Sequence, residues 1–190
     1  MIKLKLGCGQ NRLEGYINVD KYDSCSPDMV WDLEVFPWPW GTDSVKEVVM
    51  HHSLEHMGEV VNVFLSIMKE LYRVSAPNAT IFVTVPHPLS SGFFGDPTHV
   101  RPINPAIMSL FSKKNNLRFK ELGWPNTPLA TYLNVDFETT GTEFILTPPW
   151  IEQLNSGKCT EKEIYYAMDT YCNVVDEIKI TLRVCKNSEN

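Results

Sequence analysis

The first twenty residues constrain the fold more than any other part of the chain. A short apolar run, Ile2 to Leu6, leads into the turn Gly7-Cys8-Gly9, and a second run, Tyr16 to Asp20, ends in a carboxylate. The two glycines can adopt positive φ and let the backbone approach a ligand closely. A carboxylate at the end of the next strand can accept hydrogen bonds from both hydroxyls of a ribose. This order of strand, glycine turn, strand and acid is typical of a nucleotide-binding α/β unit.

The spacing within this unit argues against binding of NAD. The connection from Gly9 to Tyr16 is too short for a crossover helix, so we expect at most one helical turn, ended by Gly15. A dinucleotide fingerprint has a third glycine near position 12 and an acid about 20 residues further on. Here Arg12 takes the place of that glycine, and Asp20 follows Gly9 by only 11 residues.

The pattern further along the chain predicts an α/β fold. Apolar runs at 28–33, 44–50 and 80–85 predict three more strands, and the first of them contains a second acid, Asp32. Between the other two, apolar residues recur at helical spacing and predict an amphipathic helix over about 58–74. Strands that alternate with crossovers predict a Rossmann-like, mostly parallel sheet with helices on both faces.

Sequence patterns predict fewer elements in the second half of the chain. Asn104-Pro105 is typical of a helix start, a cap followed by a first-turn proline, for a helix to about 112. We expect strand six at 117–122, a helix over 160–172, and a last strand over 174–184 that runs antiparallel beside strand six. We expect a single domain over 1–190, with a cofactor-binding core at 1–112 and substrate-side segments and the last strands at 113–190.

Composition argues against several classes of function. Hydrophobic residues make up 43 % and charged residues 21 % of the chain, as in an ordinary globular protein. The formal net charge of −6 argues against a nucleic-acid surface. No stretch resembles a signal peptide and no apolar run approaches the roughly 20 residues that span a bilayer, so we expect a cytoplasmic protein without membrane contact. The five cysteines include no CxxC pair, which argues against a disulfide framework or a thiolate zinc site.

Several segments together resemble a known family. They are LKLGCG (4–9), GYINVD (15–20), WDL (31–33), PW with TDSV (39–45), HHSLEH (51–56), ELYRVSAPNATIFVTVP (70–86) and DPTHVRP (96–102). In this order they resemble the small class I S-adenosylmethionine-dependent methyltransferases, especially the short type often encoded with surface-glycan and secondary-metabolite genes. The resemblance covers about residues 3 to 112. The usual Pro-Gly-Gly turn is Pro77-Asn78-Ala79 here, and the segment that usually precedes strand one is missing, so we expect another cover for the cofactor cleft.

The resemblance implies S-adenosylmethionine as cofactor and gives roles to particular residues. The turn Gly7-Cys8-Gly9 would line the methionine and ribose, and Asp20 would hold the ribose hydroxyls. Asp32 with the backbone of Leu33 would contact the adenine edge, and His52 would lie beside the sulfonium. The implied activity is O- or N-methylation of a small-molecule or glycan acceptor. Whether the protein forms a homodimer is left open.

The loop after strand five is where we expect the acceptor to enter. His99 is the predicted general base, because Asp96 three residues earlier can orient its ring, and His87 is the substitute candidate. A structural role for these histidines in a Gly/Pro-rich loop is the alternative. We expect acceptor specificity to lie in 124–172.

Two other hypotheses belong to different classes. His52-x-x-Glu55-His56 matches the inverted zinc-protease motif, in which two histidines share one face of a helix. A zinc-dependent hydrolase would need a third ligand there and would leave the glycine turn and the two acids unexplained, so we expect no metal. A non-catalytic partner protein that binds the cofactor is the other alternative, and an acceptor assay separates it from an enzyme.

Overall fold

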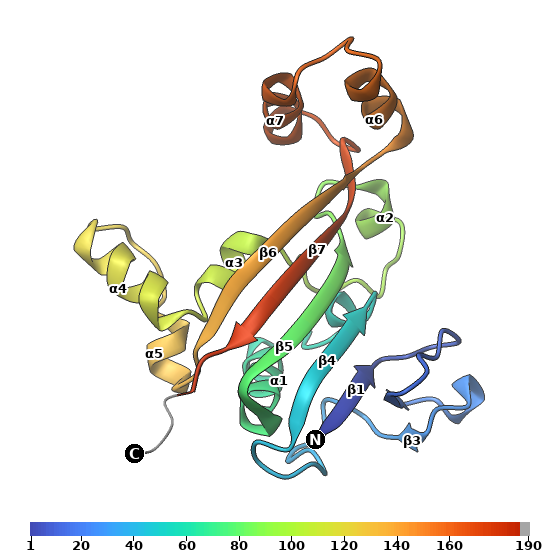
Figure 1. Cartoon of the computed structure of the whole chain (residues 1–190), viewed down its shortest axis with the longest axis vertical. Helices are drawn as coiled ribbons and strands as arrows, with labels where there is room; N and C mark the ends of the chain where they lie inside the picture. The colour runs from blue at the N-terminus through green and yellow to red at the C-terminus, as the bar shows by residue number, and fades with distance from the viewer. Residues whose placement is uncertain (187–190) are drawn as a thin grey trace.

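The computed structural model describes residues 1–186 and contains a seven-stranded sheet with the order β3-β2-β1-β4-β5-β7-β6 (Figure 1). Strands β1 to β5 are parallel, and β7 is antiparallel to both β5 and β6. The mostly parallel sheet with an antiparallel last strand is therefore confirmed. The strands are β1 (Ile2–Leu6), β2 (Ile17–Asp20), β3 (Met29–Val30), β4 (Val45–His51), β5 (Ser75–Pro86), β6 (Phe137–Leu146) and β7 (Val175–Val184).

The predicted helices form close to their expected bounds. The segment 58–74 contains α1, and α3 begins at the predicted cap, where Asn104 Oδ1 accepts the N–H of Ile107 at 2.9 Å. The helix expected at 160–172 is α7, which starts with a capping box between Thr160 and Glu163. The helices are α1 (Val61–Val74), α2 (Ser91–Phe94), α3 (Pro105–Ser109), α4 (Lys113–Glu121), α5 (Leu129–Leu133), α6 (Pro148–Asn155) and α7 (Glu161–Thr170), with 3-10 turns η1 (Asp23–Cys25) and η2 (Leu54–His56).

The prediction of strand six was wrong. Residues 117–122 lie in and just after α4, and the sixth strand is β6, some twenty residues later. Helix α4 forms because Ser112 caps it, accepting the N–H of Asn115 at 3.3 Å, and because Lys and Arg side chains keep rotamer freedom in a helix. Its apolar residues are too few and too exposed to pair with β7; Leu117 is 59 % exposed.

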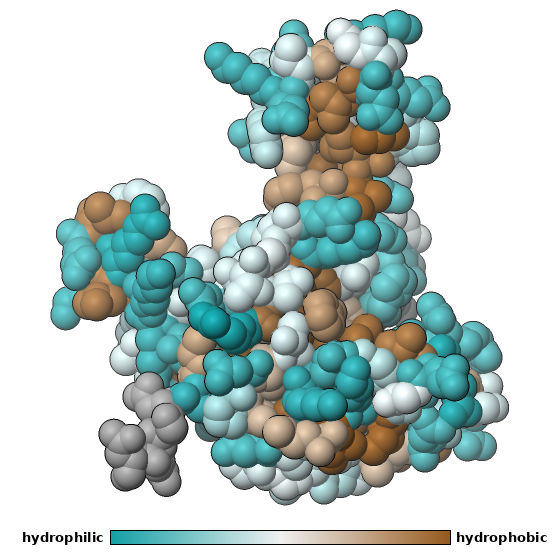
Figure 2. Space-filling view, viewed as in Figure 1, coloured by the Kyte–Doolittle hydropathy of each residue, from teal (hydrophilic) through white to brown (hydrophobic). Residues whose placement is uncertain are grey.

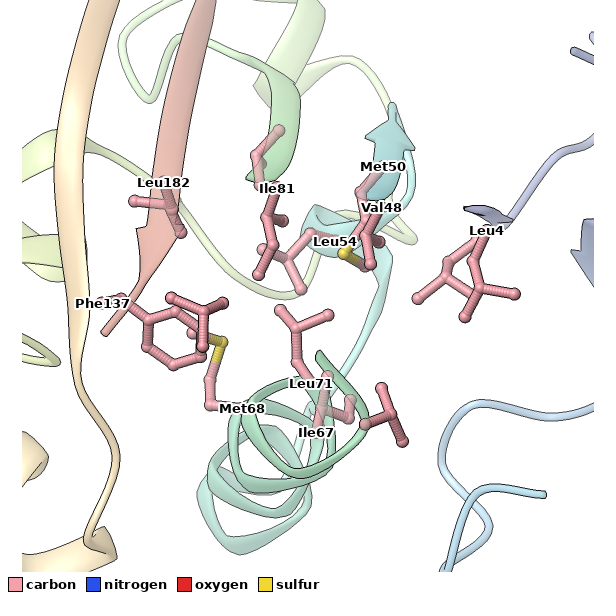
Figure 3. Packing of buried hydrophobic residues seen from close by; sticks show 14 of the residues in the cluster. Leu4, Val48, Met50, Leu54, Ile67, Met68, Leu71, Ile81, Phe137 and Leu182 are labelled. Atoms are coloured by element: carbon pink, nitrogen blue, oxygen red, sulfur yellow. The ribbon is translucent and has the colours of Figure 1, made fainter. Parts of the chain in front are cut away.

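The core lies between the sheet and α1. Alternate residues of a strand share a face, so Leu4 of β1, Val48 of β4 and Ile81 of β5 all point to one side and are fully buried. Figure 3 shows these side chains pointing toward Ile67 and Leu71 of α1, which are also fully buried. The apolar side of α1 therefore packs against the sheet face that carries these three side chains and covers it.

The face opposite α1 is left largely uncovered, which differs from the predicted helices on both faces. In right-handed βαβ topology the connections β1–β2 and β2–β3 pass over that face, and in the described chain they contain no α-helix, only η1. Figure 1 shows α1 and α3 behind the sheet, and Figure 2 shows a mixture of hydrophilic and apolar residues on the near face. Phe82, in the middle of β5, is 41 % exposed there.

Hydrogen bonds to Asn18 hold the connection that lacks a helix. Asn18 is buried; its Oδ1 accepts the N–H of Leu13 at 2.7 Å, and its Nδ2 lies within hydrogen-bond distance of the carbonyls of Leu13 and Tyr16 and of Asp28 Oδ2. The backbone N–H and the amide of Asn18 both donate to Asp28, which keeps the pKa of Asp28 below its ordinary value. The buried ammonium of Lys5 donates to the carbonyl of Asn11 in the same connection.

Replacing Asn18 by alanine is expected to lower the free energy of unfolding by about 2–4 kcal/mol, because several hydrogen bonds of about 1 kcal/mol each are lost and their buried partners stay unsatisfied. Urea denaturation measures this. Asn62→Ala, at an exposed position of α1, is the control and should change the free energy by less than about 0.5 kcal/mol. Similar small losses in both variants would show that the network does not hold the connection.

Candidate functional site

Three of the predicted cofactor residues meet at the carboxyl edge of the sheet. Leu6 at the end of β1 pairs with Val19 of β2 and with Met50 of β4, so the residues that follow these strands lie side by side. Gly7 follows β1, Asp20 is the last residue of β2, and His52 follows β4. Ligands of open α/β sheets bind at this edge, at the point where the strand order reverses. In this sheet the order reverses between β1 and β4.

The Asp20 carboxylate is held in place by the backbone of the glycine turn. Oδ2 accepts the N–H of Gly9 at 2.8 Å, and Oδ1 accepts the N–H of Tyr22 at 3.0 Å. Asp20 is 8 % exposed. A carboxylate oxygen can accept two hydrogen bonds, so each oxygen keeps one site for a further donor. The side chain is thus oriented in advance for two neighbouring hydroxyl groups.

The two glycines of the turn serve different purposes. Both have positive φ, 65° at Gly7 and 51° at Gly9. A Cβ on Gly7 would lie 2.5 Å from Cβ of Ser53, so Gly7 allows the turn after β4 to pack against β1. A Cβ on Gly9 would meet no protein atom within 4 Å, so the space beside Gly9 is open. Gly9 is therefore the glycine at which a ligand can approach the backbone.

Cys8, between the glycines, is buried. Its N–H donates to the carbonyl of Val19 at 2.9 Å, and its own carbonyl accepts the N–H of Asn11 at 3.1 Å. Burial raises the pKa of its thiol. Cys8 thus contributes to the shape of the turn through backbone bonds within the protein.

Asp32 and Leu33 lie in the loop that follows β3. Asp32 is exposed, and its Oδ1 accepts the N–H of Glu34 at 2.9 Å, which leaves Oδ2 free. Leu33 is buried, and its carbonyl accepts the indole N–H of Trp38 at 3.0 Å. Glu34 in turn accepts the N–H of Gly58 at 2.7 Å, so this loop is tied to the turn after β4.

His52 lies between two carboxylates. Its Nε2 is 2.8 Å from Glu177 Oε1 of β7, and its Nδ1 is 3.3 Å from Glu55 Oε1. The Glu55 carboxylate is the main cause that raises the pKa of His52, and Glu177 adds to it against the effect of burial. Burial, followed by the His52 charge, lowers the pKa of the neighbouring His51. His52 is thus the imidazole of this pair that carries a positive charge more readily.

The arrangement of the inverted zinc-protease motif is not formed. His52 has φ of 50° and precedes η2, which contains only Leu54–His56. The two histidines of the motif therefore do not share the face of a helix, and His52 is turned toward β7. His56 lies beside His99 instead, with ring centroids 4.5 Å apart.

His99, the predicted base, is oriented by a backbone carbonyl. Its Nδ1 lies 2.8 Å from the carbonyl of Phe93, so Nδ1 carries the proton and Nε2 keeps its lone pair. The ring stacks on Phe93, and only 9 % of the side chain is exposed. Asp96 Oδ2 is 4.0 Å from Nε2, whereas Asp96 Oδ1 accepts two bonds from Thr98. Asp96 thus orients Thr98 more directly than it orients His99.

His87, the second candidate, follows the carboxyl end of β5. Its N–H donates to the carbonyl of Asp176 at 2.8 Å, and its Nδ1 accepts the N–H of Leu89 at 3.2 Å. Partial burial lowers the pKa of His87 below its ordinary value of 6.5. The ring is therefore neutral at pH 7.

The segment expected to set acceptor specificity, 124–172, is divided between two places. Helix α5 lies toward the opposite end of the sheet, whereas α6 and α7 extend from the ends of β6 and β7 beyond the carboxyl edge (Figure 1). Asn173, at the base of this pair, bonds to the loop after β5: its N–H donates to the carbonyl of Leu89 at 3.0 Å, and its Oδ1 accepts the N–H of Ser91 at 2.6 Å. The helix pair is thus anchored to the loop that follows His87.

Sequence patterns missed several residues of this edge. Glu177 and Asn173 come from the last part of the chain, more than 100 residues after the glycine turn, and no local pattern connects them to it. Glu55 stands out in the sequence as part of the metal motif, and the structure shows that it is fully buried. A glutamate within the apolar and histidine-rich stretch 50–57 is the signal that could have singled it out.

Solved structures with the same fold exist at low sequence identity. An S-adenosylmethionine-dependent methyltransferase from Archaeoglobus fulgidus has a TM-score of 0.60 at 18 % identity, covering 95 % of this chain and 85 % of that one. A similar protein from Listeria monocytogenes, a putative S-adenosylmethionine-dependent methyltransferase, has a TM-score of 0.57 at 11 % identity, with 97 % and 91 % covered. The chain has the class I methyltransferase fold. No family model matches the sequence, and no curated protein does.

The methyltransferase fold does not by itself decide the chemistry. The cyclase SpnF has a TM-score of 0.55 to this chain at 15 % identity, with 97 % of this chain and 75 % of that chain covered.

Among the described helices, none has the length and apolar character to cross a membrane.

Gly7, which is in close contact with Ser53, and Gly15, which has open space around it, should differ in how much an alanine substitution destabilises the protein. Gly7→Ala should lower the free energy of unfolding by about 3 kcal/mol or more, from left-handed strain of about 1–2 kcal/mol plus overpacking against Ser53. Gly15→Ala has the same strain, at φ of 80°, but open space, so it should cost only about 1–2 kcal/mol. Guanidinium denaturation of the two variants makes the comparison, and equal losses would contradict the close contact with Ser53.

Proposed function

We propose that this protein transfers a methyl group from S-adenosylmethionine to an oxygen or nitrogen of a small-molecule or glycan acceptor. The observation that carries the proposal is the Asp20 carboxylate, fixed by the N–H groups of Gly9 and Tyr22 at the carboxyl edge of the sheet. It lies beside the open space at Gly9. The methyltransferase fold supports the same function.

The residues at this edge fit the cofactor in chemistry and in order. Asp20 has free acceptor sites for the two ribose hydroxyls, and Gly9 allows close approach to the backbone. The free Oδ2 of Asp32 can accept the adenine amino group. When bound, the cofactor supplies a methyl group on a positively charged sulfur, which is already a reactive donor. The task left to the protein is alignment, which can contribute roughly 7–11 kcal/mol to lowering the barrier.

The charges around His52 suit a cationic ligand group. Two carboxylates, Glu55 and Glu177, lie within 3.3 Å of one imidazole. Even with His52 protonated, this cluster has a net negative charge. A positive sulfonium nearby is therefore attracted by the cluster as a whole, although His52 alone would repel it.

Helices α6 and α7 are suited to select the acceptor. They extend past the carboxyl edge and are bonded through Asn173 to the loop that follows β5. Trp150 stacks on Tyr171 at the base of the pair, and Tyr165 and Tyr166 on α7 are more than 60 % exposed. Figure 2 shows apolar surface where this helix pair joins the sheet. The pair is also placed to cover part of the carboxyl edge of the sheet.

Asp20→Asn is expected to weaken binding of S-adenosylmethionine and of S-adenosylhomocysteine by about 1.5–3 kcal/mol, the usual worth of hydrogen bonds to a charged group. Calorimetry with both ligands measures this, and NAD should not bind. Asp136→Asn is the matched control, because Asp136 also accepts a backbone N–H, that of Lys113, but precedes β6 at the opposite end of the sheet. It should leave both affinities within a factor of about two. Equal affinity in the wild type and Asp20→Asn would remove the ribose assignment.

For an acceptor that must lose a proton, we propose His87 as the general base ahead of His99. His87 is neutral at pH 7 and lies at the carboxyl end of β5, whereas the ring of His99 is almost fully covered. The Nδ1 of His87 accepts the N–H of Leu89, so the ring proton is on Nε2. After the ring proton moves between the two nitrogens, the nitrogen left without a proton can take the proton of the acceptor. An amine acceptor that is already neutral needs no such step.

Once a screen with mass-spectrometric detection has found a hydroxyl acceptor, His87→Ala should lower kcat by about 100-fold with cofactor affinity unchanged. The pKa of His87 lies below 6.5, so the wild-type kcat should stay level from about pH 8 down to about 6.5 and fall only at lower pH, where the base becomes protonated. Full turnover in His87→Ala would show that this ring is structural. Cofactor binding without methylation of any acceptor would favour the non-catalytic alternative.

A further inference from the structure

Three side chains with metal-ligand chemistry meet beside the cofactor edge. Glu55 and His56 belong to η2, after β4, and His99 belongs to the loop after β5. One ligand atom from each residue can be chosen so that all three lie within 4.8 Å of one another. The two backbones are held together, since the N–H groups of Val100 and Arg101 donate to the carbonyl of Glu55 at 3.0 and 3.1 Å.

Glu55 is a buried carboxylate without a hydrogen bond. It is fully buried, and neither carboxylate oxygen has a hydrogen-bond partner. His52 Nδ1 is 3.3 Å from Oε1, within ion-pair distance, but the two groups are not aligned for a hydrogen bond. Burying a carboxylate in this way is costly unless cations or donors compensate it. The unused oxygens therefore indicate a place for a cationic ligand.

Both histidines are prepared as metal ligands by the bonds that their other ring nitrogens make. His99 Nδ1 donates to the carbonyl of Phe93. The hydroxyl of Thr98 donates to Asp96 Oδ1 at 2.6 Å, so it accepts from His56 Nδ1, which lies 2.9 Å away. Each ring thus has its proton on Nδ1 and a lone pair on Nε2. Carbonyl and hydrogen-bonded acceptors in this position are the usual outer partners of metal-bound imidazoles.

We propose that Glu55, His56 and His99 bind a divalent transition-metal ion, with zinc favoured by two imidazoles and one carboxylate. Ligand bonds of about 2.0–2.2 Å bring ligand atoms to about 3.3 Å apart in tetrahedral geometry, so the three side chains must close by up to roughly 1.5 Å. His56 is exposed, so the fourth position opens to solvent. The ion would join the loop after β5 to the turn after β4. It would also offset the charge of Glu55, so the net negative charge beside His52 belongs to the metal-free protein.

This site differs from the sequence motif in two ligands. The motif pairs His56 with His52, whereas the structure pairs it with His99, 43 residues later. His99 thus takes the place of His52, and Glu55 supplies the third ligand that the motif lacks. Asp96 adds a second carboxylate, 4.0 Å from His99 Nε2.

The test is a titration of the whole protein, after treatment with EDTA and dialysis, with Zn²⁺ by competition against a chromophoric chelator and with Co²⁺ by its visible absorption. One equivalent should bind, and the Co²⁺ spectrum should show the intense bands of four-coordinate geometry. His56→Ala and His99→Ala should each weaken binding at least about 10-fold. His51→Ala, an exposed histidine next to the cluster, should bind as the wild type does.

Circular dichroism checks that each variant is folded, and His56→Ala, at an exposed position, tests the site without disturbing the core. Two results would overturn the proposal: no stoichiometric Zn²⁺ or Co²⁺ in the wild type, or unchanged affinity in both folded His56→Ala and His99→Ala. Metal lost equally in His51→Ala would identify adventitious binding to surface histidines and would overturn it too. Cofactor affinity is measured on the same samples, so a failure of the metal site is separate from a failure of the proposed function.

Discussion

The short connection between β1 and β2 is the constraint on which the rest of the structure depends. It has no room for a helix, so hydrogen bonds from Asn18 and Lys5 hold it where packing would otherwise do so. The tight path brings Gly9 against the end of β2, where its N–H orients Asp20. The same shortness leaves the face opposite α1 without a helical layer. The short connection between β1 and β2 thus shapes both the carboxyl edge near Asp20 and the open face of the sheet.

In the proposed function, the turn after β4 joins the cofactor side of the site to the acceptor side. Ser53 donates to the carbonyl of Leu6 at 3.1 Å, Gly58 donates to Glu34, and the carbonyl of Glu55 receives two N–H groups from the loop after β5. Three loops that contribute to the proposed site are thus fixed to a single turn. A metal ion at Glu55, His56 and His99 would strengthen the last of these connections.

Patterns of local residues predicted the first five strands, α1, α3 and α7, because periodicity and capping are properties of neighbouring residues. Asn78, in the Pro77-Asn78-Ala79 turn, has φ of 62°, a left-handed conformation that asparagine tolerates. Strand six was misplaced because apolar content at 117–122 outweighed the helix cap at Ser112. The pairs His52–Glu177 and His56–His99 could not be predicted, since they depend on how distant strands end at one edge. The glycine turn and Asp20 could be placed because they are separated by one short connection.

The helix pair α6–α7 leaves the sheet at the ends of β6 and β7, where the N–H of Thr147 donates to the carbonyl of Val174, and Asn173 bonds its base to the loop after β5. Its sequence can therefore vary, lengthen or be exchanged for another insertion without passing through the packed layer between the sheet and α1. In the proposed function, donor binding and acceptor choice therefore lie in separate parts of the chain. A lineage could change what it modifies while its cofactor edge stays as it is, so divergence among proteins built this way should be concentrated in the insertion.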